Sequence, residues 1–286
     1  MPDGIIIIDK PVGWTSMDVC AKLRGIFHEK RIGHAGTLDP MATGVLPVFV
    51  GRATKAVEFA ESGKKEYCAV LKLGMVTDTQ DTTGEVLSSC AVDVTEEQLR
   101  QVLPRFTGEI EQIPPMYSAL KVNGQKLCDL ARKGREVERK PRRITIETLE
   151  LGERLAQDEY ALRVVCSKGT YIRTLCHDIG AALGCGGCMA SLRRTMAAGF
   201  TIGEAVTMEQ AAEQGESLLL PLAEYFRDYA VFTLQNAVQE KRCRNGNPFY
   251  ATGVADGTYR VQDAAGEFLA LSEARDGTLT AIKNFF

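Results

Sequence analysis

The sequence contains no run of about 18 consecutive apolar residues, the length that a membrane-spanning helix needs. The short apolar stretch Ile5 to Ile8 is followed by Asp9 and Lys10 and not by a cleavage site, so we expect no secretory signal. A GxxxxGKS/T phosphate-binding loop, internal repeats and low-complexity segments are also missing. These absences argue against membrane, secreted, P-loop and repeat proteins, and they predict a folded cytoplasmic protein.

Cysteine pairing is not expected either, because nine cysteines cannot all pair within one chain and no signal peptide precedes them. Cys185 and Cys188 form a CxxC pair, with Cys176 and His177 upstream, which raises a zinc or redox interpretation. The spacing matches no common zinc pattern, and a redox CxxC normally opens a helix after a strand, whereas this pair follows a helical pattern. We therefore favour small buried cysteines in a tight turn and predict no metal site. Any redox role of Cys185 and Cys188 stays open.

The formal net charge of −3 gives no sign of a polyanionic partner, but the charge is unevenly distributed. Between Lys121 and Arg143 there are nine basic residues and three acidic ones. This basic island lies in a glycine-punctuated insertion, residues 117–141, which we expect to be peripheral and mobile, with one helix over Lys126 to Lys133. A phosphate backbone and a solvated charged helix explain the island equally well on charge alone.

Hydrophobic residues make up 45% of the 286 residues, enough for one large core or for a large domain followed by a small one. From Tyr229 on, short apolar runs alternate with turns such as Asn245-Gly246 and Asp276-Gly277, a rhythm typical of a small β domain. We predict an α/β (α+β) domain over residues 1–226 and a small β-rich domain over residues 229–286.

Apolar periodicity and capping signals predict the elements of the large domain. Strands are expected over Ile5 to Asp9, Val45 to Val50, Tyr67 to Leu73, Arg143 to Leu151 and Glu159 to Ser167, and helices over Met17 to Phe27, Ala53 to Glu61, Thr95 to Pro104 and Tyr171 to Leu183. Thr95 and Gln98 form a capping-box pair. Alternation from Tyr67 would place Tyr67, Ala69, Leu71 and Leu73 on one face, and Thr77 to Gly84 is expected to be a polar loop.

The most informative segment runs from Arg31 to Val48, RIGHAGTLDPMATGVLPV. Its glycines Gly33, Gly36 and Gly44 can adopt backbone angles closed to other residues, or can let another chain approach closely. We therefore expect other parts of the molecule, or a ligand, to pack against this loop.

Asp39 in this loop precedes Pro40, which disfavours helical geometry at the aspartate and so restricts where its carboxylate points. An Asp-Pro pair is also a common helix start, here of a helix over Met41 to Val45, and taken alone the pair favours that interpretation. The helix cap does not explain why His34, Gly36 and Thr37 crowd the approach to Asp39.

Four separated segments decide between these interpretations: DKPVGWTS at Asp9 to Ser16, the glycine loop, the strand opening with Tyr67, and SKGTYIRTLCHDIG at Ser167 to Gly180. Together with Ser191-Leu192-Arg193-Arg194, they resemble the TruB family of tRNA pseudouridine synthases, in the family's order and spacing. The GHAGTLDP segment is highly specific. Cys188 and Met189 depart from the pattern, because we expect a turn of small or polar residues there.

The resemblance implies a site. Asp39 would be the catalytic aspartate, kept ionised by its partner Arg173, although an unremarkable surface arginine is the alternative for Arg173. Tyr67 would stack on a flipped base, and His34 would fill the gap that the base leaves in the RNA. Lys10 would support the loop and the substrate. Without the resemblance, Tyr67 is better explained as a core residue of a strand. Tyr171 and Leu192 would contact the substrate. The routes left open for Asp39 are attack on the ribose, attack on the base, and promotion of elimination.

The resemblance also implies a pseudouridine synthase fold, a mixed and mostly antiparallel sheet flanked by helices, with a PUA-like domain at the C-terminus. Residues 117–141 would clasp RNA, and the residues expected at its backbone are Arg132, Lys133, Arg135, Arg142 and Arg143. The implied reaction isomerises uridine 55 in the T-loop of tRNA by base flipping, without metal or cofactor, in a monomeric enzyme. The alternatives are a non-catalytic RNA-binding or RNA-folding protein, and a synthase for another RNA. A glycosidase would need a second carboxylate, which the loop does not offer.

Overall fold

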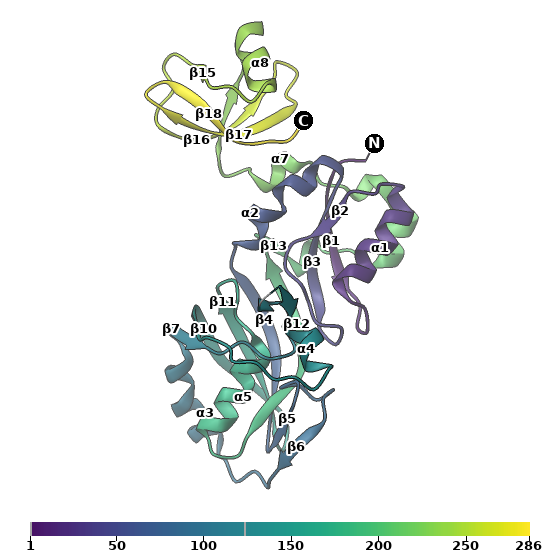
Figure 1. Ribbon diagram of the computed structural model, residues 1–286, viewed down its shortest axis with the longest axis vertical. Helices are drawn as coiled ribbons and strands as arrows, with labels where there is room; N and C mark the ends of the chain where they lie inside the picture. Colours follow the sequence, from purple (N-terminus) through teal and green to yellow (C-terminus); the bar gives the residue numbers. More distant parts are fainter. Residues whose placement is uncertain (1, 123) are drawn as a thin grey trace.

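The computed structural model describes residues 2–122 and 124–286, and two β-sheets organise the chain (Figure 1). The helices are α1 (Ser16–Phe27), α2 (Val57–Glu61), α3 (Glu96–Val102), α4 (Leu127–Ala131), α5 (Ile172–Ala182), α6 (Met208–Gln214), α7 (Leu222–Tyr225) and α8 (Ala237–Arg244). The strands of the main sheet are β1 (Gly4–Lys10), β2 (Ile32–His34), β3 (Thr43–Val50), β4 (Lys65–Leu73), β7 (Gly108–Gln112), β10 (Arg142–Ala156), β11 (Glu159–Cys166), β12 (Gly187–Ala197) and β13 (Phe200–Thr201).

The remaining strands form three smaller sheets. They are β5 (Met75–Thr77) with β6 (Val86–Ser89), β8 (Lys121–Val122) with β9 (Gln125–Lys126), and a five-stranded C-terminal sheet of β14 (Ala230–Thr233), β15 (Phe249–Tyr250), β16 (Gly257–Gln262), β17 (Phe268–Arg275) and β18 (Thr278–Asn284). Short 3-10 helices cover Gly51–Ala56, Leu103–Phe106, Ile202–Glu204 and Gly215–Leu218.

The main sheet has the order β1-β3-β12-β4-β11-β10-β7, with β2 paired to β3 and β13 paired to β12. Its pairs are antiparallel except β3 with β12, which run parallel where Arg194 lies beside Gly44. The expected mixed, mostly antiparallel sheet is confirmed. The parallel pair brings the glycine loop, which leads into β3, next to the middle of β12.

Strand β4 alternates as predicted: Tyr67, Ala69, Leu71 and Leu73 are all buried. This face of the sheet packs under α5, whose apolar side belongs to the same core cluster. Helix α3 starts at the predicted capping box, with Thr95 accepting from the Gln98 backbone and Gln98 accepting from the Thr95 backbone. Local sequence signals therefore set the central strand and the start of α3.

Several predicted elements were wrong. Asp39-Pro40 starts no helix: residues 40–41 form a turn closed by the Ala42 backbone N–H, which donates to the Asp39 carbonyl (3.0 Å). Cys188 and Met189 do not lie in a turn but in β12, fully buried. The helix expected from Ala53 to Glu61 is a 3-10 turn followed by α2. The polar loop predicted over Thr77 to Gly84 is confirmed: Thr77 ends β5, and the residues that follow form the turn of the β5–β6 hairpin.

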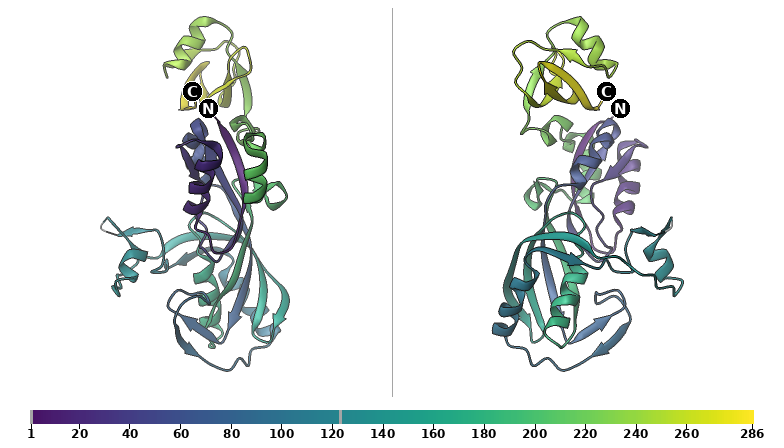
Figure 2. Two further views of the ribbon diagram at one scale, coloured as in Figure 1. Left: turned by 90° about the vertical axis from the view of Figure 1, so that its right-hand side faces the viewer. Right: turned by 60° about the vertical axis from the view of Figure 1, so that its left-hand side comes forward.

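Two parts stand apart from the main sheet. The segment that carries β8, β9 and α4, which we call the arm, projects sideways from the body in both views of Figure 2. The five-stranded sheet lies at the end of the molecule opposite the β5–β6 hairpin (Figure 1). It joins the body through Phe226, whose ring packs against Phe268 and Phe285 with centroids 5.6 and 5.5 Å away.

All nine cysteines lie in the described part of the chain, and all are free thiols. Burial raises the pKa of Cys188 to about 11. Within residues 2–122 and 124–286, no group of three His, Cys, Asp or Glu side chains could hold a metal ion. In the same residues, no helix is long and apolar enough to cross a membrane.

Candidate active site

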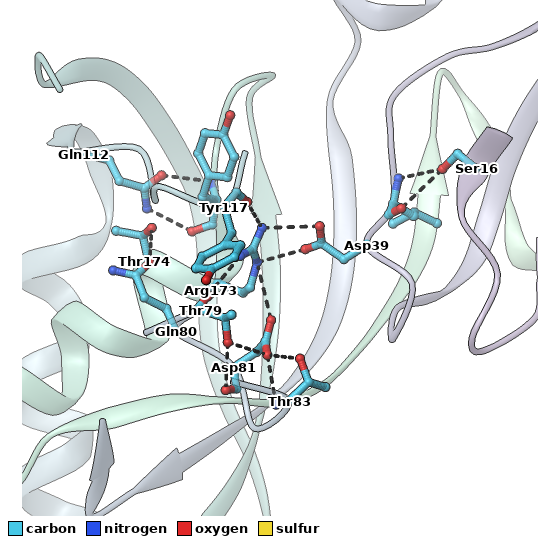
Figure 3. A network of polar contacts seen from close by, with 12 residues as sticks. Ser16, Asp39, Thr79, Gln80, Asp81, Thr83, Gln112, Tyr117, Arg173 and Thr174 are labelled. Atoms are coloured by element: carbon cyan, nitrogen blue, oxygen red, sulfur yellow. Dashed lines mark hydrogen bonds and ion pairs between the residues drawn. The ribbon is translucent and has the colours of Figure 1, made fainter. Parts of the chain in front are cut away.

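The glycine loop is fastened to the segment between β1 and α1. The Ser16 hydroxyl accepts from the Leu38 N–H (2.9 Å) and donates to the Leu38 carbonyl (3.3 Å), next to Asp39 (Figure 3). The Gly13 N–H donates to the Pro40 carbonyl (2.8 Å), and Gly13 needs to be glycine because its φ is +83°. Hydrogen bonds on both sides therefore hold the Asp39 backbone in place.

Gly44 ends the loop at the crossing with β12. A Cβ atom at Gly44 would collide with the Arg194 carbonyl oxygen, and its φ is +99°. The expected close approach of another segment is thus confirmed at Gly44, and that segment is β12. Gly33 has neither a positive φ nor a close neighbour, so the argument does not extend to it.

Lys10 lies beneath this loop and does not line the cavity described below. Its side chain is fully buried, and its ammonium donates to the carbonyl oxygens of Pro11 (2.9 Å), Trp14 (2.6 Å) and Pro40 (3.3 Å). Burial lowers the pKa of Lys10 to about 8, against the opposing influence of Asp39. The geometry makes Lys10 a support for the loop and does not give it the expected substrate contact.

Asp39 and Arg173 meet as a two-point ion pair (Figure 3). The Arg173 Nε lies 2.9 Å from Asp39 Oδ2, and its Nη2 donates to Asp39 Oδ1 at 3.3 Å. Arg173 is buried on the first turn of α5, whereas the Asp39 side chain keeps 36% of its surface exposed. A buried guanidinium that holds a half-open carboxylate leaves the carboxylate oriented and still reachable by a substrate.

The remaining donors of Arg173 bind two other segments. Its Nη1 donates to the Thr79 carbonyl (2.9 Å), and its Nη2 donates to the Tyr117 carbonyl (2.8 Å) at the root of the arm. Tyr117 is fixed in turn by its hydroxyl, which donates to Asp78 (3.0 Å). Arg173 therefore links the glycine loop, the β5–β6 hairpin and the arm.

A second carboxylate, Asp81, lies behind Arg173 and was not among the predicted site residues. Its Oδ2 is 3.8 Å from Arg173 Nε, and its side chain is only 7% exposed. Asp81 Oδ1 accepts from the Thr83 N–H (2.9 Å) and from the hydroxyls of Thr79 (2.8 Å) and Thr83 (2.6 Å). The TDTQDTT run around it was the available signal, because threonines beside an aspartate commonly bond to it in a turn.

The ion pair opens into a cavity of about 770 Å³. Among its lining residues are the predicted Asp39, Tyr67, Tyr171, Arg173, Leu192, Arg142 and Arg143, together with Lys65, Lys168 and Arg194, which were not predicted as site residues. Six cations and two carboxylates, Asp39 and Glu61, face this space. The excess positive charge suits an anionic ligand.

The two predicted tyrosines both line the cavity. Tyr67 is 7% exposed on β4, and burial raises the pKa of its hydroxyl. Tyr171 precedes α5; its N–H donates to the Gln112 side chain (2.8 Å), and its carbonyl accepts from the same amide (3.0 Å). Burial also raises the pKa of Tyr171, so both hydroxyls stay protonated at neutral pH.

The other predicted residues lie elsewhere. His34 ends β2 outside the lining, and its Nδ1 is buried without a hydrogen-bond partner among the described residues. Burial, followed by the charge of Arg194, lowers the pKa of His34. Arg132, Lys133 and Arg135 follow α4 and are exposed on the arm, apart from the cavity.

Comparison with known proteins agrees with this geometry. Residues 24–172 match the TruB family pseudouridylate synthase (N terminal domain), and residues 173–223 match the tRNA pseudouridylate synthase B C-terminal domain. The chain belongs to the TruB family. Family members are pseudouridine synthases, and this chain is accordingly an isomerase.

Relatives in the family match nearly the whole chain. The tRNA pseudouridine synthase B of Dechloromonas aromatica is 44% identical, over 97% of this chain and 93% of its own. The enzyme of the same name from Clostridium kluyveri is 40% identical, over 99% of both chains. Among solved structures, a Cbf5-Nop10-Gar1 complex contains a chain with a TM-score of 0.72 and 26% identity, covering 100% of this chain and 85% of that one.

Proposed function

We propose that this TruB-family chain is a tRNA pseudouridine-55 synthase, which isomerises a uridine of the T-loop. One observation carries the proposal: the Asp39 carboxylate, held at two points by Arg173, is half-open towards a cation-lined cavity that contains Tyr67. The relatives named tRNA pseudouridine synthase B, at 40 to 44% identity over nearly the full chain, support tRNA as the substrate.

The chemistry follows from this arrangement. A uridine in a folded loop must leave the stack to reach Asp39, at a cost of a few kcal/mol. Stacking on Tyr67 offsets that cost by about 1 to 3 kcal/mol, and Tyr171 and Leu192 bound the same space. Asp39 then acts as the nucleophile or promotes elimination, the N1–C1′ bond breaks, the base turns, and C5 bonds to C1′. His34 fills the vacated position in the RNA.

RNA contacts outside the cavity complete the proposal. Arg132, Lys133 and Arg135 on the arm, with Arg142 and Arg143 at the cavity, bind backbone phosphates. Residues 1–226 form the catalytic domain, and residues 229–286 form a PUA-like domain that approaches the acceptor end. The enzyme works as a monomer in the cytoplasm.

Tritium release tests the function directly. Unmodified tRNA carrying tritium at uridine C5 should lose it when the purified protein is added, because pseudouridine uses C5 for the new glycosidic bond. Asp39→Asn should bind the same tRNA and release none, because it loses the charge and keeps the shape. An inactive wild type that still binds and refolds tRNA would instead favour an RNA-folding protein.

A further inference from the structure

Two buried cations lie beside Tyr67 and have no part in holding Asp39. Arg194 on β12 stands directly opposite Tyr67 in the antiparallel pair with β4. Lys65 precedes Tyr67 by two residues on β4, so both side chains leave the same face of the sheet. Both cations line the cavity beneath the glycine loop, and a Cβ atom at Gly36 would lie 3.3 Å from Arg194 Nη1 and from Lys65 Cε.

Arg194 has unused hydrogen-bonding capacity. It is completely buried, its Nε donates to the Val45 carbonyl (2.7 Å), and its Nη2 donates to the Gly36 carbonyl (3.0 Å). Its Nη1 has no hydrogen-bond partner, and within residues 2–122 and 124–286 no carboxylate lies within ion-pair distance of Arg194. A buried charge in that condition is costly, and its retention calls for an explanation, which a bound anion would supply.

Lys65 is 8% exposed and also lacks an ion-pair partner among the described residues. Its ammonium donates to the Glu61 and Gly63 carbonyls, both at 3.1 Å, which leaves one N–H. Burial, then the nearby charge of Arg194, lowers the pKa of Lys65. The two buried cations therefore repel each other, and an anion bound beside them would relieve that repulsion.

We propose that Lys65 and Arg194 stabilise the negative charge that develops on the uracil ring during isomerisation. This assignment rests on the proposed function. When the N1–C1′ bond breaks, its electron pair leaves with the base and spreads over N1, O2 and O4. The ring turns, C5 bonds to C1′, the C5 proton leaves to water, and N1 takes up a proton, so the reaction is redox-neutral. Attack on C6 would also place negative charge on the ring, at O4.

The location of the two cations favours the base over a phosphate. Phosphates stay at the surface of a folded RNA, and the exposed cations of the cavity are Arg142, Arg143 and Lys168. Lys65 and Arg194 are buried at the level of Tyr67, where the base would stack. Fixed charges in a water-excluded site act most strongly on charge that appears only in the transition state.

Single-turnover tritium release at saturating tRNA, with tRNA affinity measured in parallel, tests the assignment. Lys65→Met should lower the rate about 100-fold with affinity changed less than about twofold, and Lys65→Arg should recover most of the rate. Lys72→Met is the matched control: it lies on the same strand, on the opposite face, paired with Asp158 and Glu159, and should leave the rate unchanged. Melting temperatures identify any variant that fails to fold.

Two substitutions of Arg194 are compared with each other, because any replacement of this residue also removes buried hydrogen bonds. Arg194→Lys and Arg194→Met both lose the bonds to Gly36 and Val45, and only Arg194→Lys keeps the charge, so it should be the faster by about 10-fold or more. An unchanged rate in Lys65→Met would overturn the inference. Variants that bind tRNA more weakly but keep the rate at saturating tRNA would also overturn it, because that pattern indicates a phosphate contact. A wild type without tritium release would overturn the proposed function itself.

Discussion

At the scale of single residues, the site is built by pairing charges of different burial. Arg173 is nearly enclosed, and Asp39, which it orients, keeps a third of its surface open. The Asp39 carboxylate, which we propose to be catalytic, therefore stays largely hydrated until a substrate arrives. The cost of desolvation falls on Arg173, which is compensated by two backbone carbonyls and a second carboxylate.

That second carboxylate gives the first prediction. Asp81→Asn keeps the size of the side chain and its acceptor for Thr83, but turns an amide donor towards the Arg173 guanidinium, 3.8 Å away. We expect Arg173 to shift and the single-turnover rate to fall about 10- to 100-fold, which corresponds to about 1.4 to 2.7 kcal/mol. The affinity for tRNA should stay constant, because Asp81 does not line the cavity.

Asp158→Asn serves as the control for Asp81→Asn. It removes a carboxylate of the same kind from the Lys72 ion pair, away from the cavity, and should leave the rate unchanged. An Asp81→Asn enzyme as fast as the wild type would show that Arg173 needs only Asp39 and the two carbonyls to stay in place.

The buried Lys10 predicts a pH dependence of stability. Its pKa is lowered to about 8 in the folded chain, from an ordinary value of 10.5. Between these two values the unfolded chain binds the proton more tightly, so the free energy of unfolding rises as pH rises through this window, by at most about 3 kcal/mol. Urea unfolding at pH 7.5 and pH 9.5 should show the wild type gaining stability relative to Lys10→Met.

A stability difference between wild type and Lys10→Met that does not change with pH would refute this reasoning. The comparison with Lys10→Met matters, because other groups titrate between pH 7.5 and 9.5 and affect both proteins alike. Only the part of the pH dependence that disappears with the ammonium belongs to Lys10.

At the scale of elements, the sequence predicts those whose reason is local. Strand β4 alternates because one face is buried under α5, and α3 begins where Thr95 and Gln98 cap it. Strand β12 escaped prediction because its register against β4 shifts twice and because GCMASLRRTMA mixes buried cysteine, methionine and arginine, so no period of two is visible. From the sequence alone, a charged residue such as Arg194 is expected at the surface, and only the pairing of the strands shows that it is buried.

The residues of the site also fall into those that the sequence predicted and those that it did not. Asp39, Arg173, Tyr67, Tyr171 and Leu192 were assigned through motifs, and the fold brings all five to one cavity. Asp81 was missed because its partner, Arg173, is more than 90 residues away in sequence, and pairing over such a distance leaves no local pattern.

The arm gives the next prediction, because its cations are exposed and belong to no part of the core. Replacing Arg132, Lys133 and Arg135 with glutamine should weaken tRNA binding and lower the slope of log affinity against log salt by about 2, if each contacts one phosphate. The rate at saturating tRNA should be retained. Binding measured between 50 and 300 mM salt gives the slope.

The matched control for the arm removes three exposed arginines elsewhere in residues 1–226: Arg100, Arg105 and Arg154. The net charge changes equally in the two triple variants, so a non-specific effect of charge would appear in both. Equal slopes for the two would remove the arm from the RNA interface.

At the scale of the whole molecule, the two sheets are joined by apolar rings and reinforced by charges. Phe226 contacts Phe59 from the body and Phe268 and Phe285 from the C-terminal sheet. Ion pairs cross the same boundary, Arg52 with Glu267 (3.2 Å) and Lys283 with Glu58 (2.6 Å). Exposed pairs of this kind contribute little, about 0 to 1 kcal/mol each, so the rings must supply most of the coupling.

In Phe226→Ala, we therefore expect the C-terminal sheet and the main sheet to unfold independently of each other. Phe226 is 2% exposed, and loss of a buried phenylalanine costs about 3 to 5 kcal/mol. We expect calorimetry to resolve two transitions where the wild type shows one, with the C-terminal sheet unfolding first. Phe249→Ala, inside the C-terminal core, should lower the stability of that sheet without touching the boundary. If Phe226→Ala still unfolds in a single transition, the ion pairs and not the rings couple the domains.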